Sequence, residues 1–167
     1  MAEADYYLKI TDIEGEAVVE GQEQNMQIES WSFGATNSGS ASIGTGMGTG
    51  KASLQDFHFV IQNGKASPKL FLACVNGDHK TEATLVCRKT GGGGSPYTYL
   101  KVTFNDLVIS SFQTGGSNGS STLPMEQISF NFAKITIEQF VQDTTSGNVT
   151  AGPSAIYDTK AVKGTAG

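Results

Sequence analysis

Four apolar stretches of the sequence alternate with period two, and each changes parity part-way along. In residues 125–141 the apolar side chains lie first at even positions and then at odd ones: Ile128, Phe130 and Phe132, then Ile135 and Ile137. The same change occurs in residues 25–34, 52–62 and 97–112. Period-two alternation is typical of β-strands, and a one-residue parity change marks a bulge or a strand that buries opposite faces at its two ends. Four such strands favour a tightly curved, closed barrel whose strands also line an interface between subunits.

The other regular elements are two further strands and one helix. Residues 5–13 and 80–89 read as strands, whereas Ser67, Pro68 and Gly77 suit the N-cap, the first turn and the C-terminal left-handed position of a helix. The apolar run LFLACV between them predicts a helix that is largely buried at one end of the barrel. The predicted fold is therefore mainly β: a small closed β-barrel of about six to eight antiparallel strands with one short α-helix at about residues 67–76.

The length of 167 residues is enough for one domain with a real core. We predict a single β-barrel domain over residues 1–142. The polar C-terminal tail, 143–167, then belongs to the same domain or is partly ordered, with a short strand around Ile156 and Tyr157.

A long connection, residues 36–50, separates two of the predicted strands and contains no charged residue. Structureless loops of this length are uncommon inside compact domains and are usually functional. The loop combines glycines with two apolar side chains, so we predict that it extends and docks on a second copy of the chain, through Ile43, Gly44, Gly46, Met47 and Gly48.

The amino-acid composition limits the kinds of partner that the chain can bind. Charged residues make up 16% of the chain, against roughly a quarter in typical soluble proteins, which indicates surface that is covered by partners. The net charge of −5 argues against nucleic acid, and no apolar run is long enough to insert into a membrane. The first ten residues lack the features of a signal peptide, which predicts synthesis in the cytoplasm. Cys74 and Cys87 are expected to be buried, reduced thiols.

Motifs for chemistry are absent. The glycines of residues 44–50 match neither the phosphate-binding loop nor the dinucleotide fingerprint, and no GxSxG elbow occurs. No histidine–cysteine cluster has metal-ligand spacing, and His58 is expected to be a packing residue among aromatics. The sequence predicts no enzyme activity, no cofactor and no metal.

Six segments, in order, resemble the haemolysin-coregulated protein (Hcp) family, the inner-tube proteins of bacterial type VI secretion. They cover roughly residues 5–141 and read YLKITDIEGE, ESWSFGATNSGSASIGTGMGTGKASLQDFHF, SPKLFLACVNGDH, TLVCRKTGGG, YLKVTFNDLVISSFQTGGS and EQISFNFAKITIEQ.

The resemblance implies a homohexameric ring that stacks into a tube, enclosed by a contractile sheath and tipped by a spike protein. It also implies secretion without a cleaved signal peptide, and effector proteins that ride in the lumen and are stabilised there. In the family the strand around Trp31 borders the lumen, and alternation places Ser30 and Ser32 on the face opposite Trp31 and Phe33. Ser30 and Ser32 are therefore candidate cargo-facing residues, with simple exposure to solvent as the alternative.

Two other functions fit parts of the sequence. A small all-β binding module, for example for carbohydrate, would use the aromatic side chains of Trp31, Tyr97 and Tyr99. A hydrolase would need a nucleophile motif that the sequence lacks.

Overall fold

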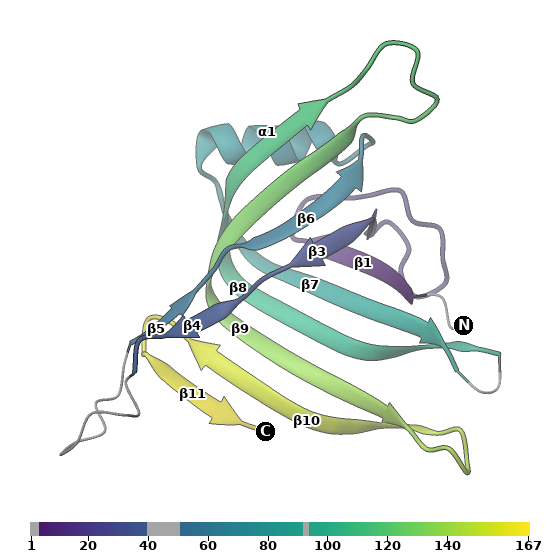
Figure 1. Ribbon diagram of the computed structural model, residues 1–167, viewed down its shortest axis with the longest axis vertical. Helices are drawn as coiled ribbons and strands as arrows, with labels where there is room; N and C mark the ends of the chain where they lie inside the picture. Colours follow the sequence, from purple (N-terminus) through teal and green to yellow (C-terminus); the bar gives the residue numbers. More distant parts are fainter. Residues whose placement is uncertain (1–3, 40–50, 92–93) are drawn as a thin grey trace.

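A computed structural model describes residues 4–39, 51–91 and 94–167 of the chain. Figure 1 shows a curved β-sheet with one helix at its upper end. The helix is α1 (Ser67–Asn76). The strands are β1 (Ala4–Ile10), β2 (Met26–Ile28), β3 (Ser30–Ser32), β4 (Ala35–Asn37), β5 (Ala52–Leu54), β6 (Phe57–Gln62), β7 (His79–Thr90), β8 (Pro96–Gly115), β9 (Met125–Gln142), β10 (Val149–Asp158) and β11 (Lys163–Ala166). A mainly β fold with one short helix is confirmed.

The main sheet is built around β9, which has two different partners on one of its edges. Its first half pairs with β6, its second half pairs with β10, and β8 follows the other edge. The strand order is β11-β10-β9-β8-β7-β1-β2, with β6 and β3 off this path. The sheet therefore divides into two branches along this edge of β9. One branch holds β6 and β3, and the other holds β10 and β11.

The parity change has a visible cause in β8. Val102 and Phe104 are fully buried before the change, and Leu107 is fully buried after it. Between them Asp106 has a φ of 54°, a left-handed conformation that is rare for a residue with a side chain. One residue in this conformation turns the next side chains to the other parity, so both ends of the strand contribute to the core.

The pairing of the strands does not show the closed barrel that we predicted, because the hydrogen-bonded strand order has two ends, β11 and β2. Residues 25–34, predicted as one strand, contain two strands, β2 and β3, which pair with β1 and β6 respectively. In the C-terminal tail, β10 spans ten residues and pairs with β9, so the strand there is longer than the short one predicted around Ile156.

Aromatic side chains fill the centre of the molecule. Phe57, Phe59, Phe104 and Phe130 are at most 1% exposed, and the ring centres of Phe57 and Phe104 are 4.8 Å apart. Burial of such large apolar side chains supplies most of the driving force for folding.

The helix has the predicted bounds but not the predicted cap or burial. Gly77 is left-handed as expected, with a φ of 64°. Ala66, not Ser67, occupies the N-cap position, because the Ser67 hydroxyl donates instead to the Glu126 carboxylate. The helix is also not largely buried, since only one side of it faces the sheet.

The two cysteines lie in different environments. Cys87 is fully buried, as predicted, and burial raises the pKa of its thiol to about 12. Cys74, on α1, is only half-buried. Both are free thiols.

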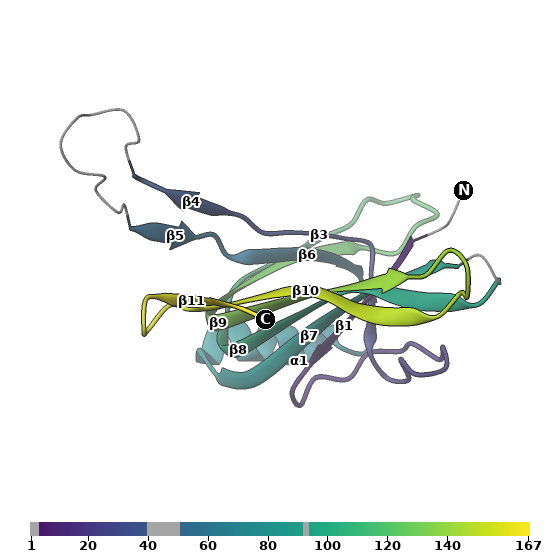
Figure 2. The ribbon, with the colours of Figure 1, turned by 90° about the horizontal axis from the view of Figure 1, so that it is seen from below.

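Strands β4 and β5 pair with each other in a separate two-stranded sheet, and in Figure 2 they run away from the body of the molecule as a projecting arm. The loop residues predicted to dock on a second copy, Ile43, Gly44, Gly46, Met47 and Gly48, lie outside the described residues.

Candidate functional site

Strand β3 places the two predicted cargo-facing serines on the exposed surface. Ser30 and Ser32 are exposed, whereas Trp31 between them is half-buried and points to the opposite face. The Trp31 ring contacts the ring of Phe57, with ring centres 6.2 Å apart. Alternation along β3 therefore separates serine from tryptophan as the sequence indicated.

Strand pairing extends this serine surface across four strands. Residues directly opposite each other in paired strands share a face. Ser32 lies opposite His58, which in turn lies opposite Ser129, and Ser30 lies opposite Val60. In β8, Ser111 and Gln113 lie opposite Ser129 and Gln127 of β9. We call this surface the polar face; it is made of Ser30, Ser32, His58, Val60, Ser111, Gln113 and Gln127.

The polar face surrounds a shallow hollow of about 410 Å³. None of its seven side chains is a carboxylate, a lysine or an arginine. Hydroxyl and amide groups both donate and accept hydrogen bonds, so they can contact the main chain of many polypeptides without selecting for charge. Such a surface suits weak, varied contacts better than one tight ligand. His58, predicted to be a packing residue, is instead an exposed member of this face.

Hydrogen bonds between serine side chains connect the polar face to the buried Ser129. The buried Ser129 hydroxyl shares hydrogen bonds with the hydroxyls of Ser110 and Ser111, and Ser110 donates to Asp56 at 2.6 Å. The network sits where the register of β8 and β9 shifts between Ile109 and Ser111. It pairs polar groups that the bulge brings together. Among the described residues no hydrogen bond joins His58 to a serine, so the contacts are not those of a serine–histidine nucleophile.

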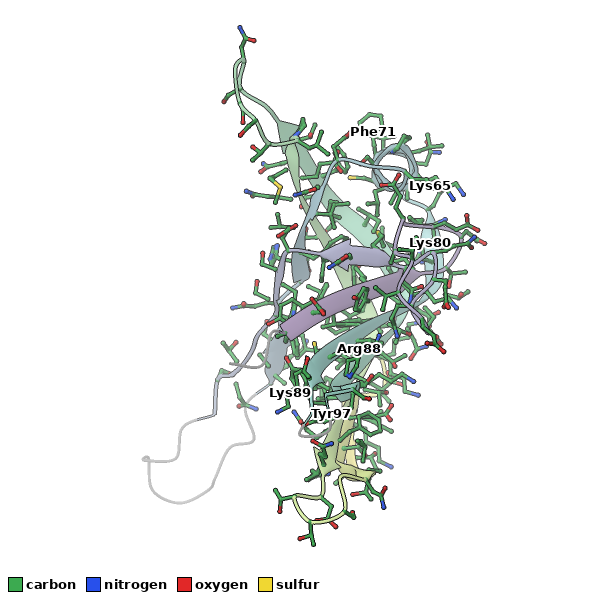
Figure 3. All side chains as sticks on the ribbon, turned by 90° about the vertical axis from the view of Figure 1, so that its right-hand side faces the viewer. Lys65, Phe71, Lys80, Arg88, Lys89 and Tyr97 are labelled. Carbon is green, nitrogen blue, oxygen red and sulfur yellow. The ribbon has the colours of Figure 1, made fainter. Side chains whose placement is uncertain are left out.

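The aromatic residues proposed for carbohydrate binding are not brought together. Lys89 lies over the rings of Tyr97 and Tyr99, at 5.7 Å and 5.0 Å from their centres. Figure 3 shows Lys89 and Tyr97 near each other in the lower part of the molecule. Within the described part of the chain, the ring contacts of Trp31 are with Tyr6, Phe33 and Phe57, not with these tyrosines.

Residues 4–39, 51–91 and 94–167 contain no cluster of three or more His, Cys, Asp or Glu side chains that could bind a metal ion. Over the same residues, no helix has the length and apolar character needed to cross a membrane.

Comparison with known proteins decides the family. Residues 7–139 match the family described as "Type VI secretion system effector, Hcp". The chain belongs to the Hcp family. It is 34% identical over 134 residues to Protein hcp1 of Pseudomonas aeruginosa, an alignment that covers 80% of this chain and 82% of that one. The tube-subunit function that the sequence resemblance implied is therefore assigned to this Hcp chain, a structural component of the type VI secretion system.

Solved structures agree with this family. Hcp1 from Salmonella typhimurium is 30% identical, with a TM-score of 0.76, and the match covers 99% of this chain and 100% of that one. A second structure, described as a type six secretion system protein, is 25% identical with a TM-score of 0.88 and covers 98% of this chain and 100% of that one. The Hcp fold is thus matched over nearly the whole chain, β10 and β11 included.

Sequence reasoning found two residues of the polar face and missed the other five. Alternation within one strand identified Ser30 and Ser32. The others lie on β6, β8 and β9, and only the pairing of these strands places them beside β3. The alternation of His58 and Val60 with Phe57, Phe59 and Ile61 was a signal in the sequence that could have added these two residues.

Proposed function

We propose that this Hcp chain assembles into homohexameric rings that stack into the inner tube of the type VI secretion system, with the polar face lining the lumen. The observation that carries the proposal is the seven-residue uncharged surface, which spans four strands and lies on the opposite side of the sheet from the aromatic core. In Figure 2, β3 and β6 lie on one side of the molecule and α1 lies on the other. A lumen lined in this way holds unfolded or folded effectors loosely and releases them.

The proposal includes barrel closure and a single domain. Residues 26–32 pair with β1 at their start and with β6 at their end, and the Glu29 amide donates to the Val60 carbonyl at 2.8 Å. This segment carries hydrogen bonding from β1 round to β6, and β6 pairs with β9. We take the barrel to close along this path, within one domain over residues 1–142, with β10 and β11 as its extension.

The partners follow from the assembly. The chain is made in the cytoplasm and joins rings that the contractile sheath surrounds and the spike protein tips. Sheath contraction then expels the tube, with its effector cargo, without a cleaved signal peptide. Electron microscopy of the purified protein tests the assembly: rings with an open centre are expected, and fields of single small particles at high concentration would contradict it.

Changing the polar face should alter cargo and leave the ring intact. Ser32 is exposed, so Ser32→Arg costs little folding energy but adds a charge at each position around the lumen. We expect the proteins that co-purify with rings from the producing cell to fall several-fold, as measured by quantitative mass spectrometry. Glu20→Gln changes the net charge by the same amount on a distant loop and serves as the control. Unchanged cargo in Ser32→Arg would place Ser32 outside the lumen.

Changing the loop should affect assembly and leave the subunit folded. Ile43 and Met47 are the apolar side chains of an uncharged loop carried by the β4–β5 arm, which leaves the body. The double change Ile43→Asp and Met47→Asp is expected to weaken ring stacking or ring closure, because carboxylates resist burial in an apolar contact. Circular dichroism should show an unchanged β signal and a melting temperature within a few degrees of the unmodified chain. Outright unfolding would mean that the loop packs inside its own subunit.

A further inference from the structure

Three exposed positions of α1 carry large apolar side chains, beside the exposed Lys69 and Asn76, which is unusual for a surface helix. Phe71, Leu72 and Val75 are 50%, 53% and 60% exposed. Surface helices normally turn charged or polar residues outward. Phe71 is held in place by an edge contact with Phe112, at 5.8 Å between ring centres. We call these three residues the helix ridge; its side chains project from an ordered element and are not covered by their own subunit.

A second uncovered apolar surface lies on the sheet extension made by β10, β11 and the second half of β9. The apolar rows of the core continue onto these strands: Val102 lies opposite Ile137, which lies opposite Ala155, and Phe104 lies opposite Ile135. Val102 and Phe104 are fully buried, but Ala155 and the paired strand β11 are exposed. Small residues leave a hollow of about 300 Å³ there, the wing hollow, lined by Ile135, Ile137, Ala155, Ile156, Tyr157, Gly164, Thr165 and Ala166.

The helix ridge and the wing hollow lie toward opposite ends of the molecule. In Figure 1 the long axis is vertical, α1 lies near the top, and β10 and β11 lie near the bottom. Figure 3, from the side, places Phe71 near the top as well. One surface is convex, the other is hollowed, and neither contains a charged side chain. Both surfaces are apolar, and because they lie toward opposite ends of the molecule they do not meet within one subunit.

We infer that the helix ridge of one copy seats in the wing hollow of the next copy, and that this contact joins neighbouring subunits within the ring. The inference rests on the proposed ring and names the surfaces that close it. Because the two surfaces are different patches of one chain, the contact is head-to-tail, and head-to-tail contacts generate rings when the rotation closes. Contact with a neighbouring copy would also remove these clustered apolar side chains from water.

The test uses one change on each surface. Leu72→Asp alters the ridge at a half-exposed helix position, and Ala155→Asp alters the hollow at an exposed strand position. Neither removes a buried side chain, so both chains should fold. Each is expected to raise the protein concentration needed for ring formation by about a hundredfold, measured by light scattering after size exclusion. Val18→Asp, at a position that is 89% exposed and outside both surfaces, is the matched control and should still form rings.

Mixing the two variants distinguishes this contact from any symmetric one. The Leu72→Asp chain keeps an intact hollow and the Ala155→Asp chain keeps an intact ridge, so one good contact forms between them. The mixture should give one-to-one dimers that do not extend, while each variant alone stays monomeric. A charge-swapped chain with Leu72→Lys and Ala155→Asp together should recover part of the assembly, because the two new charges meet across the contact.

The outcomes separate the inference from the proposed function. If the unmodified chain never forms rings, the proposed function is wrong. If the unmodified chain forms rings and the folded Leu72→Asp and Ala155→Asp chains do so equally well, this inference alone is overturned. If either single variant fails to fold by circular dichroism, the charge-swapped chain and the milder pair Leu72→Ser and Ala155→Ser replace it, and unchanged ring formation by these would also overturn the inference.

Discussion

Phe57→Ala is expected to lower the free energy of unfolding of the subunit by about 4 kcal/mol, the largest loss of any single truncation in the core. Phe57 has no exposed surface and touches five aromatic rings: Trp31, Phe33, Phe59, Phe104 and Phe130. These rings come from β3, the link after it, β6, β8 and β9, so they cannot all move in to fill the space. The removed ring leaves a cavity whose lining loses its contacts, and that cost adds to the lost transfer free energy.

The measurement is denaturant unfolding at one fixed protein concentration, because assembly would otherwise add to the apparent stability. Phe57→Leu is the graded control and should cost about 1–1.5 kcal/mol, since it keeps most of the side-chain volume. A loss below about 1 kcal/mol for Phe57→Ala would show that the aromatic cluster is not the centre of the core.

Glu126→Ala is expected to cost about 3 kcal/mol and to loosen the start of α1. Glu126 is only 1% exposed, and two side chains donate to its carboxylate: Asn63 to Oε1 at 2.8 Å and Ser67 to Oε2 at 2.7 Å. Neither of the two ion pairs among the described residues involves Glu126. Hydrogen bonds to a charged group are stronger than neutral ones, and removing the acceptor leaves two donors without their partner.

Two contacts join the turn before α1 to the start of β9. The Asn63 side chain donates to the Glu126 carboxylate, and the Asn63 backbone N–H donates to the carbonyl of Pro124, the residue before β9. Faster amide hydrogen exchange in the first turn of α1 should therefore accompany the loss of stability. A double-mutant cycle with Ser67→Ala should give a coupling of about 1 kcal/mol. Additive effects of the two changes would mean that the hydrogen bond between Ser67 and Glu126 contributes nothing to folding.

Local features of the sequence predicted most of the elements, although residues 25–34 and 52–62, each predicted as one strand, contain two. Period-two alternation identified the strands, and the parity change in β8 is confirmed by the left-handed Asp106 at that point. Pro68 and Gly77 fixed the helix bounds, because a fixed φ suits the first turn and a left-handed φ ends it. In the helix, each of these positions needs a particular φ that one residue type adopts easily.

Long-range pairing was not predictable in the same way. Alternation shows that a strand buries one face, but not which strand lies beside it. Nothing in residues 125–142 indicated that β9 pairs with β6 along its first half and with β10 along its second. The buried Glu126 was missed for the same reason, since Asn63 and Ser67 are far away in the sequence.

The exposure of α1 is the clearest difference between expectation and structure. A helix that is apolar on all sides normally lies in a core, which is why the run LFLACV predicted burial. In the structure Leu70 and Ala73 face the sheet, while Leu72 and Val75 do not. If a neighbouring copy covers this side of α1, as we infer, the apolar pattern reflects the assembly and not the isolated subunit.

The mass of the purified protein in solution tests the central claim most directly. Light scattering after size exclusion, run across a wide range of concentration, should give a mass six times that of one chain, and the peak should persist on dilution. A mass of one chain at every concentration would contradict the ring, although the Hcp fold and the family would stand.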